Sequence, residues 1–256
     1  MAGKTAEPDI LTYRQIVMSN PPRDIRTFTN GTTGYIEASF YRAHQLIEGD
    51  LHLVRLGLED AGSFLQEGNT DAAIKSLGKS AHSMDASVAK LGKMHMMSPE
   101  DFSAFRRYFT GHSGLNGPSG LYSHGIPIMD LLLVGSMLPD EYSKGLIEGL
   151  TKGYYPERKI IADALKRAQN NQSLIDFAER LKNPTLFNEI LALAKSVMRF
   201  RGAHYGVVKK QLPEAVNNEV TGTGGQDNPG TFLRGRVAAY QQIIIRIQER
   251  VDQYGS

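Results

Sequence analysis

Apolar residues recur three and four positions apart along most of this chain, which is the spacing of an amphipathic helix. The first such segment covers residues 36–67, with apolar positions at Ile36, Phe40, Ala43, Ile47, Leu51, Val54 and Leu58. The same pattern predicts helices at about 71–91, 99–109, 139–150, 156–169, 172–181, 184–212 and 231–253, and an apolar helix ending near Met137. Strand alternation and hairpin signals are missing, so we predict an all-α helical bundle with long C-terminal helices.

Capping and breaking residues set the predicted boundaries. Thr70 is the candidate N-cap of the second helix, and Ser98 is that of the third, with Pro99 at the first helical position. The glycine-rich segment 111–120 and the loop 213–230 interrupt the helical pattern, and a loop as long as the latter is usually functional or disordered. We expect residues 1–30 to form an N-terminal arm and residues 31–256 to form a single helical domain.

Composition narrows the class of protein. At 256 residues and 41% hydrophobic content, the chain can bury one substantial core. Its 29 basic and 27 acidic residues leave a formal net charge of +2, which gives no electrostatic reason for a nucleic-acid or membrane partner. No apolar run approaches the roughly 18 residues of a membrane span, and the N-terminus lacks the apolar core of a signal peptide. We therefore expect a cytoplasmic protein.

His204 is the strongest candidate for chemistry. The segment 198–210 reads MRFRGAHYGVVKK, with Phe200 one turn before the histidine, so the imidazole emerges from an apolar helical face. Gly202 and Gly206 flank the histidine and would leave room for a flat group, although close helix packing explains such glycines as well. A lone histidine on an apolar helix is commonly a satisfied core residue, so the pattern alone leaves both interpretations open.

Two other pairs place an aromatic ring one turn before a polar group, namely Phe40 with His44 and Phe102 with Arg106. Each pair is weak evidence by itself, because an arginine beside a phenylalanine usually extends to water. The sequence GTGG at 222–225 is typical of a flexible loop, but successive glycines also let backbone N–H groups converge on an anion. None of these motifs is specific by itself, but their order along the chain is.

Taken together, these segments resemble the tryptophan 2,3-dioxygenase and indoleamine 2,3-dioxygenase superfamily. Residues 201–204 match the family's Arg-x-x-His on a long helix, and 222–225 match its Gly-Thr-Gly-Gly loop. EASFYRAHQL at 37–46 is similar to the family's Leu-Phe-x-x-x-His-Gln, and MSPEDFSAFR at 97–106 is similar to Met-Thr-Pro-x-x-Phe-x-x-Phe-Arg. The resemblance spans about residues 36–236 and implies a helical bundle that encloses a b-type haem.

The resemblance assigns a role to each matching residue. His204 would be the axial ligand of the haem iron, with Arg201 and Gly222 as further cofactor-binding residues. His44 would have the catalytic role of accepting a hydrogen bond from the indole N–H, and the planar guanidinium of Arg106 would pair with the substrate carboxylate. The implied substrate-binding residues are Phe40, His44, Phe102, Arg106, Ser113, Gly114, Thr223 and Gly224. The chain has no cysteine, which excludes a thiolate-ligated haem.

The remaining histidines carry weaker expectations. His52, His82 and His95 occupy polar helix positions, where we expect them to be solvated. His112 and His124 flank the glycine-rich segment and could approach the haem edge. The chain contains no zinc-binding spacing such as His-Glu-x-x-His.

The implied activity is oxidation of the indole ring of L-tryptophan or a tryptophan derivative, with O2 as co-substrate and an N-formylkynurenine-like product. We expect a homo-oligomer, either a dimer or a tetramer. The chain departs from the family at 113–117 and after the glycine loop, where it reads SGLNG and QDNPG. These departures leave the substrate and product open. One alternative is an indole C2 monooxygenase of a biosynthetic pathway that gives an oxindole, and another is a non-catalytic haem-binding or sensor protein.

Overall fold

All regular secondary structure in the described part of the chain is helical, and that part contains no strand. The computed structural model describes residues 29–94, 97–110, 125–138, 172–211, 213 and 229–255. Its elements are α2 (Gly31–Gln66), α3 (Thr70–Met94), α4 (Pro99–Thr110), α5 (Gly125–Val134), the 3₁₀ turn η2 (Gly135–Met137), α8 (Leu174–Leu181), α9 (Pro184–Gln211) and α11 (Pro229–Gly255). The all-α prediction is therefore confirmed for these residues.

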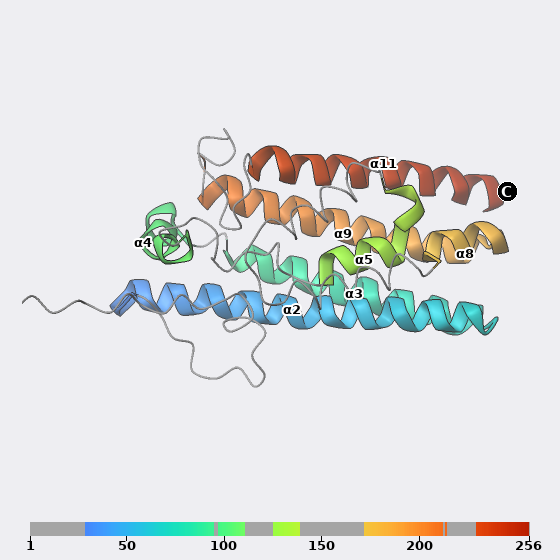
Figure 1. Cartoon of the computed structure of the whole chain (residues 1–256), viewed down its shortest axis with the longest axis horizontal. Helices are drawn as coiled ribbons and strands as arrows, with labels where there is room; N and C mark the ends of the chain where they lie inside the picture. Colours follow the sequence, from blue (N-terminus) through green and yellow to red (C-terminus); the bar gives the residue numbers. More distant parts are fainter. Residues whose placement is uncertain are drawn as a thin grey trace, which may run out of the picture.

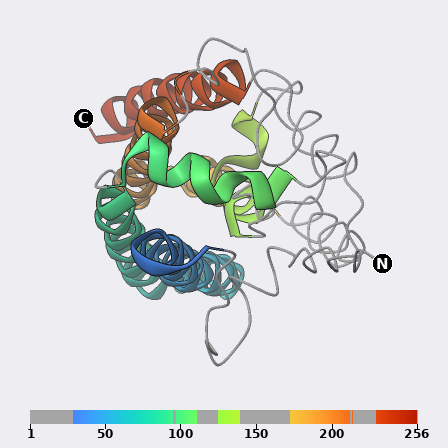
Figure 2. The same ribbon diagram turned by 90° about the vertical axis from the view of Figure 1, so that its left-hand side faces the viewer.

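The four long helices α2, α3, α9 and α11 run alongside one another and pack in that order (Figure 1). Viewed from one end, they form a curved layer, and α5 lies on its concave side (Figure 2). The short helix α4 lies across the near end of this layer. Because α4 contacts both α2 and α9, this end brings together segments that lie far apart in the sequence.

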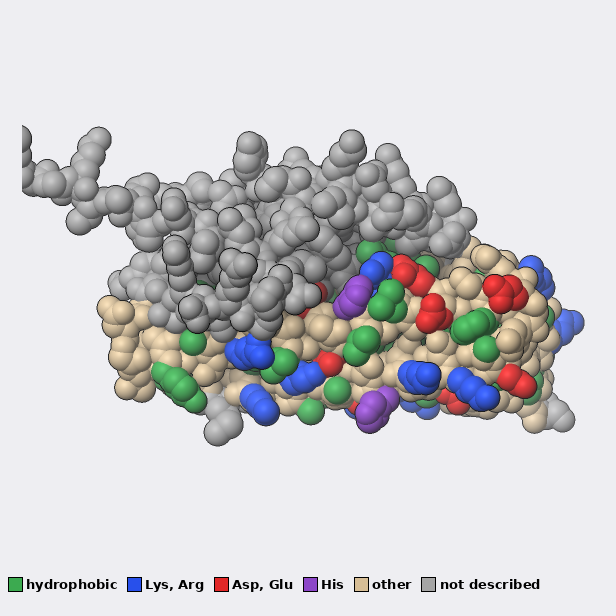
Figure 3. Space-filling view, turned by 90° about the horizontal axis from the view of Figure 1, so that it is seen from below, with side chains coloured by type: hydrophobic (Ala, Val, Ile, Leu, Met, Phe, Trp, Pro, Cys, Tyr) green, Lys and Arg blue, Asp and Glu red, His purple; other side chains and the backbone are tan. Residues whose placement is uncertain are grey.

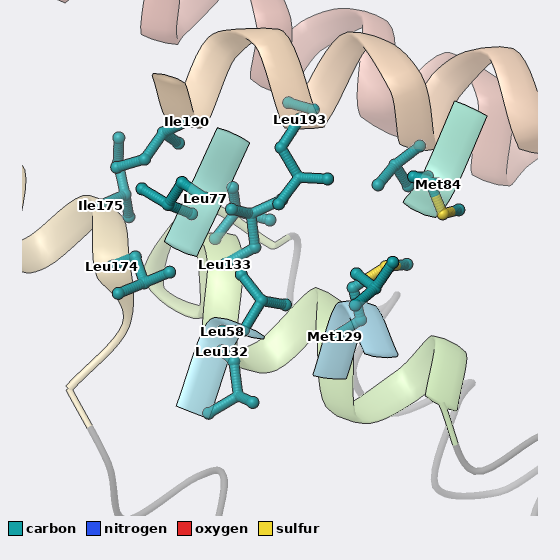
Figure 4. Close-up of a cluster of buried hydrophobic side chains, with 14 of the residues drawn as sticks. Leu58, Leu77, Met84, Met129, Leu132, Leu133, Leu174, Ile175, Ile190 and Leu193 are labelled. Atoms are coloured by element: carbon teal, nitrogen blue, oxygen red, sulfur yellow. The ribbon is translucent and has the colours of Figure 1, made fainter. Parts of the chain in front are cut away.

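The core fills the space between the curved layer and α5. The sequence GIPIMDLLLV of α5 is apolar almost all round, and such a helix is stable only when it is buried on every side. Figure 4 shows the cluster that surrounds it, with Leu58 from α2, Leu77 and Met84 from α3, Met129, Leu132 and Leu133 from α5, Leu174 and Ile175 from α8, and Ile190 and Leu193 from α9. The predicted apolar helix ending near Met137 is thus confirmed.

The capping predictions have mixed outcomes. The prediction that Ser98 opens α4 is confirmed, because its Oγ accepts a hydrogen bond from the Asp101 backbone N–H at 3.1 Å. The prediction that Thr70 caps α3 is wrong. Thr70 is the first residue of the helix, and the side-chain oxygen of Asn69 accepts the bond from the Ala72 N–H at 3.2 Å. Asn69 can take this position because Gly68, at a φ of +78°, turns the chain sharply after α2.

Several predictions lie outside the described residues. They are the helices 139–150 and 156–169, residues 1–28 of the arm, the glycine-rich segment 111–120, and the part of the loop 213–230 between positions 214 and 228. The division into an arm and a single domain therefore remains a prediction. No helix in the described part of the chain is both long enough and apolar enough to cross a membrane.

Candidate functional site

The candidate site is built around two histidines that come from helices distant in sequence. His44 is on α2 and His204 is on α9, and each side chain is only partly exposed. The ring of Phe40 lies 4.3 Å from that of His44 and 5.6 Å from that of Phe102 on α4, measured between centroids. Three of the residues implied to bind substrate, Phe40, His44 and Phe102, therefore form one aromatic group.

The backbone of α2 determines the protonation of His44. Its Nδ1 lies 2.9 Å from the carbonyl oxygen of Phe40, an atom that can only accept a hydrogen bond. Nδ1 must therefore carry the proton, and the lone pair of the neutral ring is then on Nε2. Burial also lowers the pKa of His44, so the ring is neutral near pH 7. The result is a fixed hydrogen-bond acceptor beside two phenylalanine rings.

His204 is also held neutral. Burial, the largest cause, lowers its pKa from 6.5 to about 4. The other causes are repulsion between a protonated His204 and the charges of His44, Arg201 and Arg236. The electrostatic field of each of these groups, from α2, α9 and α11, therefore reaches the His204 ring. An imidazole with this pKa has a free lone pair at neutral pH, which is the state that binds a metal ion.

A buried charge network ties α9 to α5 and α11 one turn before His204. Arg201 forms a salt bridge with Asp130 of α5, whose side chain is fully buried. The hydroxyl of Tyr240 on α11 donates a hydrogen bond to the other oxygen of Asp130, and the guanidinium carbon of Arg201 lies 4.8 Å from the Tyr240 ring centroid. These contacts fix the rotation of α9 about its axis, and with it the direction of His204.

Sequence reasoning missed this network, although one signal for it was present. Asp130 is a single acid inside the apolar run of α5. A carboxylate in such a position must find a buried partner, because an isolated buried charge is very unfavourable. The resemblance implied that Arg201 is a cofactor-binding residue. Its described contacts are with Asp130 and Tyr240, so it acts at least in part through the helix that it holds.

Gln211 performs a similar task at the end of α9. Its side-chain nitrogen donates to the carbonyl oxygens of Met94, at 3.2 Å, and Met97, at 2.6 Å. Met94 ends α3, and Met97 precedes α4. The buried amide therefore fixes the connection that carries Phe102 into the site.

The start of α2 is fixed by a buried carboxylate. Glu37 accepts hydrogen bonds from the backbone N–H of Thr29 at 2.9 Å, from the Thr29 hydroxyl at 2.6 Å and from the Tyr41 hydroxyl at 2.8 Å. Burial, together with the adjacent carboxylate, raises the pKa of Tyr41, which therefore stays protonated as a donor. Phe40 lies between these two residues in the sequence, so the network supports the aromatic group.

The other predicted residues are placed only in part. Arg106 lies on α4 four residues after Phe102, but the structure describes only its backbone and not its side chain. The loop residues Ser113, Gly114, Gly222, Thr223 and Gly224 also fall outside it, as do His95, His112 and His124. His52 and His82 are exposed, as expected.

The structural role expected of Gly202 needs correction. A methyl group placed on Gly202 would meet nothing within 4 Å, so close helix packing is not its purpose. Two residues correspond to about 200° around a helix, which puts Gly202 on nearly the opposite side from His204. Gly202 therefore does not make room for a group bound at the His204 ring. Phe200 and Val207, both buried, lie one turn on either side of that ring.

In the described part of the chain, no group of three or more His, Asp or Glu residues is arranged to hold a metal ion. A single neutral imidazole such as that of His204 suits a metal whose other ligands come from a bound cofactor. A search of protein-family models and a search of curated proteins each found no match to this chain.

We predict that Asp130→Asn lowers the free energy of unfolding by about 3–5 kcal/mol, because it leaves the Arg201 charge buried without its counter-ion. The matched control is Asp85→Asn, which breaks the exposed pair between Arg199 and Asp85. That change should cost under about 1 kcal/mol, since water screens the pair. Urea unfolding of both variants measures the difference. Equal, small effects would show that the buried pair does not hold α5, α9 and α11 together.

Proposed function

We propose that this chain is a haem-dependent oxygenase that uses O2 to oxidise the indole ring of L-tryptophan or a tryptophan derivative. The observation that carries the proposal is that two histidines on different helices, His44 and His204, are both held neutral, with His44 fixed beside an aromatic group. The two residues lie on different helices, and the family resemblance assigns them to opposite sides of one haem site.

The residues around His204 fit a haem. Its lowered pKa keeps the imidazole unprotonated, and the buried Phe200 and Val207 provide an apolar surface on the same side of α9. A bound haem would supply the redox chemistry with O2. The chain's part is to hold the iron through His204 and to keep α9 in one orientation through Arg201 and Asp130.

The residues around His44 fit an indole. The rings of Phe40 and Phe102 offer an aromatic surface, and the Nε2 lone pair of His44 offers an acceptor for the indole N–H. Accepting this bond would set the position of the ring's C2–C3 bond, which is catalysis by orientation. A protein that only stored or sensed haem would have no use for this acceptor, and this favours an enzyme.

Recognition of the amino-acid part of the substrate remains a proposal from the resemblance. The resemblance assigns Arg106 to binding the substrate carboxylate and Gly222 to binding the haem. It assigns the loop residues Ser113, Gly114, Thr223 and Gly224 to substrate binding. α4 carries Arg106 one turn beyond Phe102, which is buried at the end of the bundle. This order along α4 is consistent with an indole near Phe102 and a carboxylate near Arg106.

The direct test is turnover of L-tryptophan by the haem-loaded chain under labelled O2. We expect a Soret band that shifts when L-tryptophan is added, and a product that contains label. Both oxygen atoms in the product would identify a dioxygenase of the N-formylkynurenine type, and one atom would identify an indole C2 monooxygenase that gives an oxindole. A chain that takes up haem but forms no oxidised indole would refute the proposed activity and favour a haem-binding or sensor role.

We predict that His204→Ala abolishes stoichiometric haem binding, because the variant has no neutral imidazole on that face of α9. His82→Ala is the matched control, since His82 is exposed on α3. Haem titration followed at the Soret band compares the two variants with the native chain. Full haem uptake by His204→Ala with an unchanged ferrous spectrum would remove His204 from the axial position.

We predict that His44→Ala retains haem and that its turnover of tryptophan falls by at most about tenfold. One net hydrogen bond is worth roughly 0.5–1.5 kcal/mol, which corresponds to a rate change of that size. Native protein should prefer tryptophan over its N1-methyl analogue, and the variant should lose most of that preference. His52→Ala, an exposed histidine on the same helix, is the control. An inactive His44→Ala variant that still binds tryptophan normally would point to obligatory proton transfer at His44.

A further inference from the structure

Helix α2 is apolar on two opposite sides. One side packs into the core through residues such as Tyr41, Leu51 and Leu58, which are almost completely buried. The other side exposes 75% of Tyr35, 41% of Leu46, 55% of Leu53 and 39% of Leu56. These are four of the six large apolar residues that are exposed in the described part of the chain. Scattered exposed leucines need no explanation, but a row of them on one helix face marks an interaction site.

The exposed row has a defined order, and we call it the outer stripe. It runs Arg42, Leu46, Gly49, Leu53, Leu56 and Asp60, at alternating spacings of three and four residues. Arg42 and Asp60 are both exposed and are separated by about five turns, or about 27 Å, so they lie on the same line along the helix. Gly49 interrupts the leucines, and a methyl group there would meet nothing within 4 Å.

The outer stripe is complementary to itself when its direction is reversed. If a second α2 lies antiparallel, with a twofold axis on the outer face of the helix at the level of residue 51, Leu46 faces Leu56 of the other copy, and Leu53 faces the open position at Gly49. In the same register, Arg42 faces Asp60 of the other copy at both ends of the contact. We propose that the outer stripe is the interface between two copies of this chain, which pack α2 against α2 in antiparallel fashion about a twofold axis.

The identity of the partner follows from the symmetry of the stripe. A twofold interface requires each residue and its mirror position to suit each other, and an unrelated partner imposes no such condition. Here opposite charges occupy the two mirrored ends, and a large residue and a gap occupy the mirrored centre. A leucine that inserts opposite a glycine also allows the helices to approach closely, as in knobs-into-holes packing. Figure 3 views the molecule from below relative to Figure 1. On this face apolar side chains lie among charged ones.

Such a contact would stabilise a dimer by desolvating the leucines, and the charges would set its direction. At a crossing angle near +20°, two long helices stay in contact over several turns, enough to include both ends of the stripe. A parallel arrangement would put Arg42 opposite Arg42 and Asp60 opposite Asp60, which is unfavourable. The antiparallel register is therefore the one that both the shape and the charge of the stripe favour.

The test is a charge exchange at the two ends of the stripe. Arg42→Asp alone and Asp60→Arg alone each create two like-charge contacts, and each should raise the dimer dissociation constant roughly tenfold. The double variant Arg42→Asp with Asp60→Arg restores opposite charges and should return the constant to within about threefold of native. The two positions are too far apart to interact within one chain, so recovery can come only from the partner copy. Sedimentation velocity over a concentration series gives the constants for the full chain.

A second variant tests the centre of the stripe. Leu53→Lys should weaken the dimer by about a hundredfold or more, because it buries a charge at the interface. Leu181→Lys is the matched control, since Leu181 is 44% exposed but lies on α8, away from the stripe. Circular dichroism and the melting temperature check that all variants fold. A native chain that stays monomeric at micromolar concentration overturns the proposal. A dimer dissociation constant that Leu53→Lys leaves unchanged also overturns it. So does a double charge exchange that fails to return the constant toward the native value.

Discussion

The carboxylate of Asp130 is the constraint on which the rest of the site depends. It lies inside an apolar helix and is fully buried, so it is compatible with folding only if positive charge and hydrogen-bond donors reach it. Arg201 and Tyr240 meet this need from α9 and α11, on two sides of the same core. An apolar core alone would let α9 rotate or slide at small cost. The ion pair favours a single rotation of α9, and that rotation sets the direction of His204, one turn after Arg201.

The environment of the two histidines explains why they can have different tasks. Both are kept neutral by burial, but only His44 has its Nδ1 committed to a backbone carbonyl, that of Phe40. The proposed oxygenase uses this difference, with one imidazole as an iron ligand and the other as an acceptor for the substrate N–H. Gln211 and Glu37 do not reach the histidines in the described contacts. They fix the connection before α4 and the start of α2, which carry Phe102 and Phe40.

Helix α2 links the site to the outside of the molecule. Its inner side carries Phe40, His44 and the core leucines, and its outer side carries the exposed leucines proposed to meet a second copy. A dimer contact along α2 would restrain the same helix that positions the proposed substrate acceptor. The outer stripe itself rests only on exposure, spacing and charge along α2, and it is independent of whether the chain binds haem.

Much of the fold follows from the sequence, because helical periodicity and capping residues are local properties. The extents of α2, α8, α9 and α11 agree with the predictions to within a few residues at most ends, as does the opening of α4 at Ser98. The pairs Phe40 with His44 and Phe102 with Arg106 were also predictable, since one helical turn separates the members of each. The error at Thr70 arose because two adjacent residues can both cap a helix, and the turn at Gly68 decides between them.

The tertiary structure alone decided which of these local groups meet. No periodicity in α5 indicates that Asp130 pairs with Arg201, since the two residues come together only when both helices pack against one core. The neutral state of His44 and of His204 likewise depends on burial that no single segment provides. Gly202 is a different case, because helical geometry alone places it on the side of α9 away from His204, and the structure adds only that a methyl group there would meet nothing within 4 Å. Local sequence determines helices and their faces, whereas packing determines which faces share a site and what charge they carry there.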